Sequence, residues 1–207
     1  MDILDDLFKQ YIKKGFIPVW LAKFLGKEIE EGHIQTYFHG KKYKTPLIWP
    51  LTSQLMKFLG LFVAEGHTDK RQIGFTFSRN ERDLVKFVSD VGFILGIGYS
   101  VEERPEKNSI RVKFFGGVIS YLFRKWCGHT AKNKKIPGFV YTSSKQLRQD
   151  FLDYLYVGDG HSFKKSNQLS LGTTSKDLAN QTLYLWLMQG VVASIGSNLT
   201  KGFRESL

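Results

Sequence analysis

The chain has 207 residues, 42% of them hydrophobic, which is enough to build the core of one compact unit or of two small halves. Its 30 Lys and Arg against 19 Asp and Glu give a formal net charge of +11 at pH 7, which predicts a polyanionic partner. We expect an intracellular, cytoplasmic protein that binds no membrane, because the acidic start is no secretory signal, no lipidation signal is present, and a single cysteine cannot form an internal disulfide.

The first 50 residues predict a helical extension followed by an irregular basic loop. Apolar residues recur at helical spacing on both sides of a glycine, and Pro18 is suited to start the second of two short helices. Two such helices could read DNA as a helix-turn-helix, but we favour an extension packed against the next domain. The loop Gly40–Pro46 contains Lys41 and Lys42, which we expect to follow a phosphate backbone.

Residues 51–128 form the first predicted half, which begins with a buried apolar helix. Thr52 and Ser53 are residues that cap helix N-termini, and Gly66 predicts a helix end with positive φ. The periodicity then predicts, in order, a short strand at 67–70, a strand at 72–78, a helix at 81–95, strands at 99–104 and 109–115, and a helix at 118–126. This order is typical of an α+β fold with an antiparallel sheet covered on one face by helices.

The second predicted half, 143–207, follows a basic linker at 129–142 and repeats the order in a shortened form. Ser143 and Ser144 precede its apolar helix, and Gly160 closes that helix. Strands near 161–165 and 168–174, a helix at 176–189 and a third strand at 198–204 follow. No counterpart of the last strand and helix is visible, so either the second half is an abbreviated copy or the sequence ends early.

The two apolar helices end alike, each in a small residue, a carboxylate, a glycine and a histidine. A carboxylate at a helix C-terminus is disfavoured by the helix dipole unless a cation compensates it. The two endings are Ala64-Glu65-Gly66-His67 and Gly158-Asp159-Gly160-His161.

These endings and the runs before them resemble the LAGLIDADG motif of homing endonucleases. Without gaps, Leu61 and Leu155 match its second leucine, and the acids and final glycines match as well. Two copies in one chain look like the single-chain, two-motif branch of the family, which implies a monomer with two pseudo-symmetric αββαββα halves, saddle-shaped sheets and a two-helix interface. Departures from the motif are Val63 and Val157 in place of its first aspartate, and Asp153-Tyr154 in place of its small Ala-Gly pair.

The resemblance implies a metal centre at the two acids. In the family, the corresponding acids and the carbonyls just before them hold metal ions, which makes Glu65 and Asp159 the catalytic metal ligands, with Ala64 and Gly158 as carbonyl ligands. Phosphodiester cleavage needs charge neutralisation and an activated water, and Mg²⁺ supplies both, with Mn²⁺ as a plausible substitute. The bland alternative is that each acid caps a surface turn.

The linker resembles the Lys-x-Ile-Pro segment that precedes the family's second motif, where a lysine approaches the reacting phosphate. Lys135, directly before Ile136, is our first choice for the catalytic lysine, and Lys132 or Lys134 is the alternative. A basic run is more often a loop that contacts phosphates, so all three lysines are also candidate DNA contacts. We interpret the two motif histidines as strand-start residues facing DNA and not as general bases.

Strand alternation predicts which side chains face the DNA. In 109–115 the apolar positions share one face, which leaves Arg111 and Lys113 on the other. Arginine and amide or hydroxyl side chains are suited to read base edges. The predicted DNA contacts are Gln72, Thr76, Ser78, Arg79, Arg104, Arg111, Lys113, Lys164, Lys165, Gln168, Ser170, Thr200, Arg204, Lys41, Lys42, Lys132 and Lys134.

The resemblance therefore implies a site-specific homing endonuclease that makes a metal-dependent, staggered double-strand cut in a long DNA site. No starting Cys or Ser suggests intein splicing, so we favour an intron-encoded enzyme. Two other classes share the fold: RNA maturases, for which intron RNA would be a partner, and non-cleaving DNA-binding regulators. Retention of both acids argues for cleavage, because a regulator has no use for them.

Overall fold

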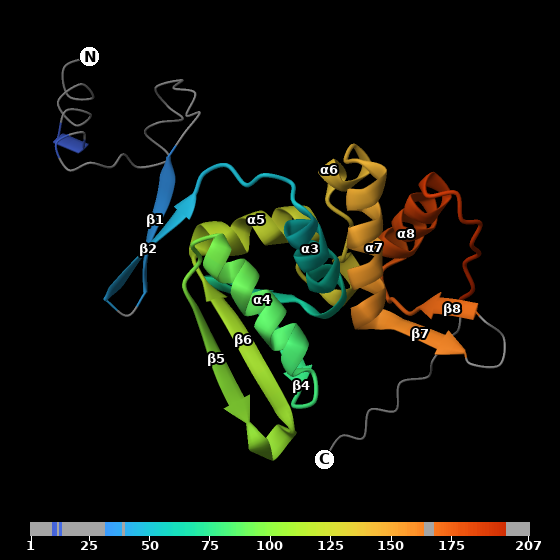
Figure 1. Cartoon of the computed structure of the whole chain (residues 1–207), viewed down its shortest axis with the longest axis horizontal. Helices are drawn as coiled ribbons and strands as arrows, with labels where there is room; N and C mark the ends of the chain where they lie inside the picture. Colours follow the sequence, from blue (N-terminus) through green and yellow to red (C-terminus); the bar gives the residue numbers. More distant parts are fainter. Residues whose placement is uncertain (1–9, 12, 14–31, 39, 164–167, 198–207) are drawn as a thin grey trace.

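The computed structural model describes residues 10–11, 13, 32–38, 40–163 and 168–197 of the chain (Figure 1). The predicted N-terminal helices lie almost entirely outside this part, and the predicted strand at 198–204 lies wholly outside it. The helix-turn-helix alternative therefore stays a prediction. In the described part, no helix is long and apolar enough to cross a membrane.

The first half has the predicted order of elements. It runs through α3 Ser53–Glu65, β3 His67–Asp69, β4 Gln72–Ser78, α4 Arg82–Ile94, β5 Tyr99–Arg104, β6 Ser109–Phe115 and α5 Gly117–Cys127. The strands form one antiparallel sheet in the order β3-β4-β6-β5. The apolar residues of β4 and β6 are buried, while the other face of the sheet carries the polar side chains.

The described part of the second half has fewer elements than the first half. It contains α7 Lys145–Asp159, the antiparallel pair β7 Gly160–Phe163 and β8 Gln168–Leu171, and α8 Lys176–Met188. Within the described residues, nothing corresponds to β5, β6 and α5 (Figure 1). The alternation of Leu169 with Gln168 and Ser170 predicts an apolar inner face for Leu169, but this residue is 66% exposed. The two strands and one following helix described here bury less of each sheet face than the four strands and three helices of the first half do.

The N-terminal segment differs from the expected irregular loop, because β1 His33–Phe38 and β2 Lys41–Pro46 form an antiparallel hairpin. Two alternate residues of β2, Tyr43 and Thr45, face the body of the protein. The Thr45 side chain is buried and its hydroxyl donates to the Gly96 carbonyl at 3.1 Å. Tyr43 packs so closely on Gly98 that a Cβ there would lie 2.4 Å from the ring. The lysines between them mask this alternation in the sequence.

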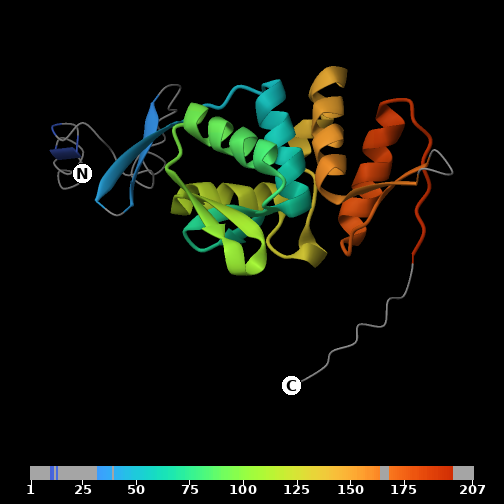
Figure 2. The same cartoon turned by 60° about the horizontal axis from the view of Figure 1, so that its bottom comes forward.

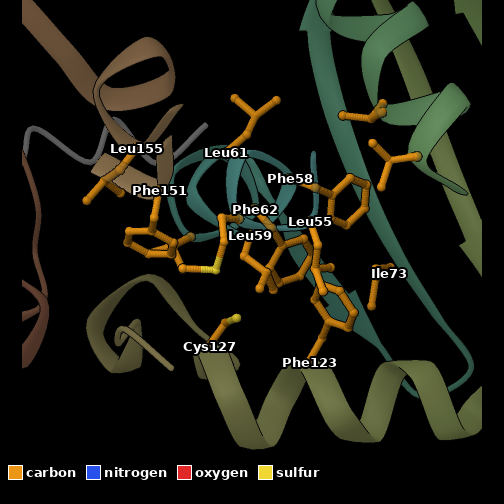
Figure 3. Close-up of a cluster of buried hydrophobic side chains, with 14 of the residues drawn as sticks. Leu55, Phe58, Leu59, Leu61, Phe62, Ile73, Phe123, Cys127, Phe151 and Leu155 are labelled. Atoms are coloured by element: carbon orange, nitrogen blue, oxygen red, sulfur yellow. The ribbon is translucent and has the colours of Figure 1, made fainter. Parts of the chain in front are cut away.

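The helices α3 and α7 pack against each other along the boundary between the halves, and their side chains form one core with the sheet and α5 (Figure 3). At Gly60, an added Cβ would lie 2.1 Å from the Phe151 carbonyl oxygen, so backbone touches backbone at this crossing. Tyr154, which replaces a small motif residue, packs instead on Phe87 of α4 at 4.8 Å between ring centroids. The large residue is thus accommodated beside the crossing.

Candidate active site

Both motif helices begin as predicted and end differently from the prediction. The Thr52 and Ser144 side chains accept hydrogen bonds from backbone N–H groups of the first turns, at 3.2 and 3.4 Å. Gly66 and Gly160 were expected in the left-handed region, but their φ angles are −71° and −84°. Glycine is needed there for space: a Cβ at Gly66 would lie 2.2 Å from the Phe62 ring, and one at Gly160 would lie 2.2 Å from a backbone oxygen.

The two acids come together where α3 and α7 end. A Cβ added to Gly158 would lie 3.2 Å from Glu65 Cγ, so the Glu65 side chain lies beside the residue that precedes Asp159. Partial burial and the neighbouring Asp159 both raise the pKa of Glu65. Burial also raises the pKa of Asp159, opposed by Lys134 and His161. The two carboxylates therefore form one electrostatically coupled pair.

Lys134 supplies the cation that an acidic helix C-terminus requires. Its Nζ lies within hydrogen-bond distance of four carbonyl oxygens, which share its three N–H donors: Phe62 at 3.1 Å, Val63 at 2.7 Å, Ala64 at 3.0 Å and Gly66 at 2.7 Å. Burial lowers the pKa of Lys134 to about 8, although Asp159 and Glu65 favour the charged form. One ammonium group thus satisfies the free carbonyls of α3 beside both acids.

Lys135, our first choice from the sequence, is exposed, and its backbone N–H donates to the Cys127 carbonyl at 3.0 Å. Lys134 lies in extended backbone, with φ −60° and ψ 140°. Residues two apart in extended backbone share a side, so Lys134 points inward with the buried Ile136, and Lys135 points outward. The pattern of a lysine two residues before a buried isoleucine could have identified Lys134. The catalytic role of Lys135 stays a prediction that this placement does not favour.

The predicted alternation of buried and more exposed side chains along β6 is confirmed. Ile110, Val112 and Phe114 are buried, while Arg111 and Lys113 are only partly buried on the opposite face. Thr76 is paired with Arg111 across β4 and β6 and is exposed. Their contact with DNA remains a prediction.

Two acids of β5 were missed in the sequence: Glu102 lies on this face, and Glu103, which is paired with the buried Ile110, lies on the opposite one. Glu102 of β5 is paired with Arg111 and accepts a hydrogen bond from Lys113 Nζ at 2.8 Å, which lowers the pKa of Glu102. Glu103 contacts Arg79 at 3.8 Å and Arg82 at 3.1 Å. Consecutive glutamates within a predicted strand were the available signal. These ion pairs hold basic side chains that would otherwise be free for phosphates.

The remaining predicted contacts are distributed over the molecule. Lys41, Lys42, Lys132 and Ser170 are exposed, and Arg104 is partly buried within 4.0 Å of Glu102. Gln168 begins β8. His67 lies over Gly74, and burial together with Arg111 lowers its pKa. Four predicted residues lie outside the described part: Lys164, Lys165, Thr200 and Arg204.

Comparison with known proteins fits this geometry. Residues 146–206 match the family model of the LAGLIDADG-like domain. The chain contains a LAGLIDADG-like domain. A crystal structure of I-DmoI in complex with DNA and Mn has a similar fold, with a TM-score of 0.53 and 12% identity over 71% of this chain and 83% of that one. The predicted α+β class is thereby confirmed.

Curated relatives of this LAGLIDADG protein are much longer than the chain. A DNA polymerase of Thermococcus aggregans is 33% identical over 190 residues, which are 81% of this chain and 9% of the polymerase. The ATP-dependent DNA helicase Hel308 of Thermococcus kodakarensis is 32% identical over 176 residues, 81% of this chain and 16% of the helicase. Proteins with different names thus share one segment with this chain.

The acid pair of the LAGLIDADG helices is suited to a hard divalent cation. Within the described residues, no group of three or more His, Cys, Asp or Glu could hold a metal ion. Two neighbouring carboxylates repel each other, and a bound divalent cation removes this repulsion. Mg²⁺ is suited to such a site, because it can take its remaining ligands from phosphate and water. The Ala64 carbonyl, a predicted ligand, accepts a hydrogen bond from Lys134, so a metal there would share it with the ammonium group.

Proposed function

We propose that this LAGLIDADG protein is a site-specific homing endonuclease that cuts double-stranded DNA with a divalent metal ion. The observation that carries the proposal is the meeting of Glu65 and Asp159 at the ends of two helices packed backbone to backbone, with the ammonium group of Lys134 near both acids. This arrangement places destabilising charge in the interface of the two halves. Such a cost is expected where the charge has a chemical task.

Each part of the site has a chemical role in the proposal. Glu65 and Asp159 would hold the metal, which when bound neutralises charge on a phosphodiester and lowers the pKa of a water nucleophile. We propose Mg²⁺, with Mn²⁺ as a substitute. Lys134 keeps the α3 carbonyls and the acids in place and adds positive charge near the phosphate. The sheet faces hold the duplex so that a phosphate reaches the acids.

The same geometry also supports a staggered cut, a monomeric enzyme and a long DNA site. Two acids related by pseudo-symmetry suit one cut on each strand, which gives a staggered double-strand break made by a monomer. A strand projects every second side chain to one face, so two sheets can contact a long site. Residence in an intron stays a prediction. The relatives share only a segment with this chain, so their named polymerase and helicase activities are not proposed for it.

The proposal is tested with a plasmid that carries the chain's genomic insertion point restored to its uninterrupted sequence. We expect the purified protein to linearise this plasmid in Mg²⁺, to leave it intact in EDTA, and to spare a plasmid with a scrambled site. Binding without cleavage in both Mg²⁺ and Mn²⁺ would favour the regulator alternative. Binding to the intron RNA and not to the DNA would favour the maturase.

Replacement of Arg111 by alanine tests the reading face. We expect a loss of roughly 1–3 kcal/mol of binding free energy on the preferred site and relaxed base choice at one or two adjacent positions, because arginine reads guanine in the major groove. The measurement is the affinity for all single-base variants of the site. A uniform loss across the panel would show that Arg111 contacts only phosphates.

Loss of the lysines in the β1–β2 hairpin should weaken DNA binding without changing base preference, unlike the loss of Arg111. Replacing Lys41 and Lys42 together by glutamine should weaken binding to all sequences alike and reduce the slope of log K against log salt by about 2, since each phosphate contact contributes about 0.9. Binding isotherms from low to high salt measure this slope. An unchanged slope would remove the hairpin from the DNA interface.

A further inference from the structure

The linker that carries Lys134 is held by side chains of the second half. Ser175, the N-cap of α8, is 1% exposed, and its hydroxyl donates to the Lys134 carbonyl at 2.6 Å. Gln181, in the next turns of the same helix, accepts from the Ile136 N–H at 2.7 Å. The residues on either side of Lys135 are thus both hydrogen-bonded to α8, which lies beside the linker and α7, to their right in Figure 2.

The first half holds the same linker from the other side. The Lys135 N–H donates to the carbonyl of Cys127, the last residue of α5. Gly128 follows with φ +85°, and a Cβ there would lie 1.9 Å from the Asn133 carbonyl oxygen, so the linker passes close to the end of α5. Lys134 itself then reaches the last turn of α3. The position of its ammonium group is therefore determined jointly by both halves.

We propose that Ser175 and Gln181 are positioning residues that set Lys134 of the linker on the C-terminal carbonyls of α3, so that chemistry at the first motif depends on a helix of the second half. The inference rests on the proposed nuclease function. Ser175 has two roles, because its oxygen also accepts the Leu178 N–H at 3.2 Å as a helix cap. A test must separate the cap from the contact to Lys134.

The chain offers a matched control for the cap. Ser144 caps α7 in the same way, accepting the Leu147 N–H at 3.4 Å, but it is exposed, and its hydroxyl has no contact to the linker among those found in the described residues. Glycine is nearly as good as serine at an N-cap, so Ser175→Gly and Ser144→Gly should perturb their helices similarly. Ser175→Thr keeps the hydroxyl and serves as the rescue variant. Gln181→Met keeps the length of the side chain but removes the acceptor.

The first measurement does not depend on cleavage. In the full chain, dilute acetic anhydride should acetylate Lys134 more slowly than the exposed Lys132 and Lys135, as followed by mass spectrometry. We expect Ser175→Gly and Gln181→Met to speed acetylation of Lys134 about fivefold to tenfold relative to those lysines, because a lost hydrogen bond releases the linker. Ser144→Gly and Ser175→Thr should leave the ratio within about twofold of wild type. An unchanged ratio in Ser175→Gly and Gln181→Met would overturn the proposal.

The second measurement is single-turnover cleavage of the plasmid site at saturating protein. We expect Ser175→Gly and Gln181→Met to lower the rate constant about tenfold with DNA affinity within about twofold of wild type, and Ser175→Thr to restore it. Faster acetylation with an unchanged cleavage rate would overturn the functional part of the inference. If the wild-type protein cuts no DNA, the proposed function fails, while the acetylation ratio still decides whether α8 places Lys134.

Discussion

Replacement of Glu65 by glutamine or of Asp159 by asparagine should abolish double-strand cleavage while DNA affinity stays close to wild type. The amides keep the size and packing of the acids but lose the negative charge that holds a divalent cation. Cleavage of the plasmid site and binding of the same DNA in Ca²⁺ are the two measurements. Full-rate cleavage by either variant would remove that acid from the site.

The same substitutions should stabilise the metal-free protein at neutral pH. The pKa values of both acids are raised in the folded state, so the folded protein holds its protons to higher pH than the unfolded chain. Stability therefore falls as the pH rises through the range between the unfolded and folded pKa values, and it stays lower above that range. Thermal unfolding in EDTA should show a higher Tm at pH 7 for Glu65→Gln than for wild type. The difference should vanish at a pH below both pKa values.

Replacement of Gly60 by alanine should have the largest effect on the helix pair. Its Cβ would lie 2.1 Å from the Phe151 carbonyl oxygen and 3.0 Å from the Leu155 nitrogen, and backbone atoms cannot rotate away. We expect a loss of about 1–3 kcal/mol of unfolding free energy from overpacking. The helices must separate or slide, and a displacement of about 1 Å at the acids is enough to slow cleavage roughly 100-fold.

Gly117→Ala is the matched control, because Gly117 begins α5 and an added Cβ there meets nothing within 4 Å. Urea unfolding should place this control within about 0.5 kcal/mol of wild type, the usual range for a surface change. If Gly60→Ala is as stable and as active as Gly117→Ala, the close crossing of the motif helices has no role in the site.

Periodicity alone predicted most of the first half. β5 and β6 have the predicted bounds, because apolar and polar residues alternate along β6 and a turn-forming segment at Pro105–Lys107 separates the two strands. The hairpin β1–β2 was missed, since its inward positions are few and lie between lysines. The predicted burial of Leu169 was wrong, because alternation shows which residues share a face of a strand but not whether another element covers that face.

In the candidate site, too, the sequence identified some residues and missed others. Glu65 and Asp159 were found because each ends an apolar helix with an unfavourable charge, a local signal that the sequence displays twice. Lys134 was ranked behind Lys135 because the choice depends on which side of the extended linker faces α3. Ser175 and Gln181 had no local signal, since their partners lie about 40 residues away.

The central claim is that Glu65 and Asp159 hold metal together, and radical mapping with Fe²⁺ in place of Mg²⁺ tests it most directly. Ascorbate and peroxide convert bound Fe²⁺ into a source of hydroxyl radicals that cut the nearest backbone. In the DNA-bound protein we predict chain scission close to both residue 65 and residue 159, suppressed by excess Mg²⁺ and lost at both places in Glu65→Gln. Scission at one place alone, or at sites away from the ends of α3 and α7, would contradict a shared metal site.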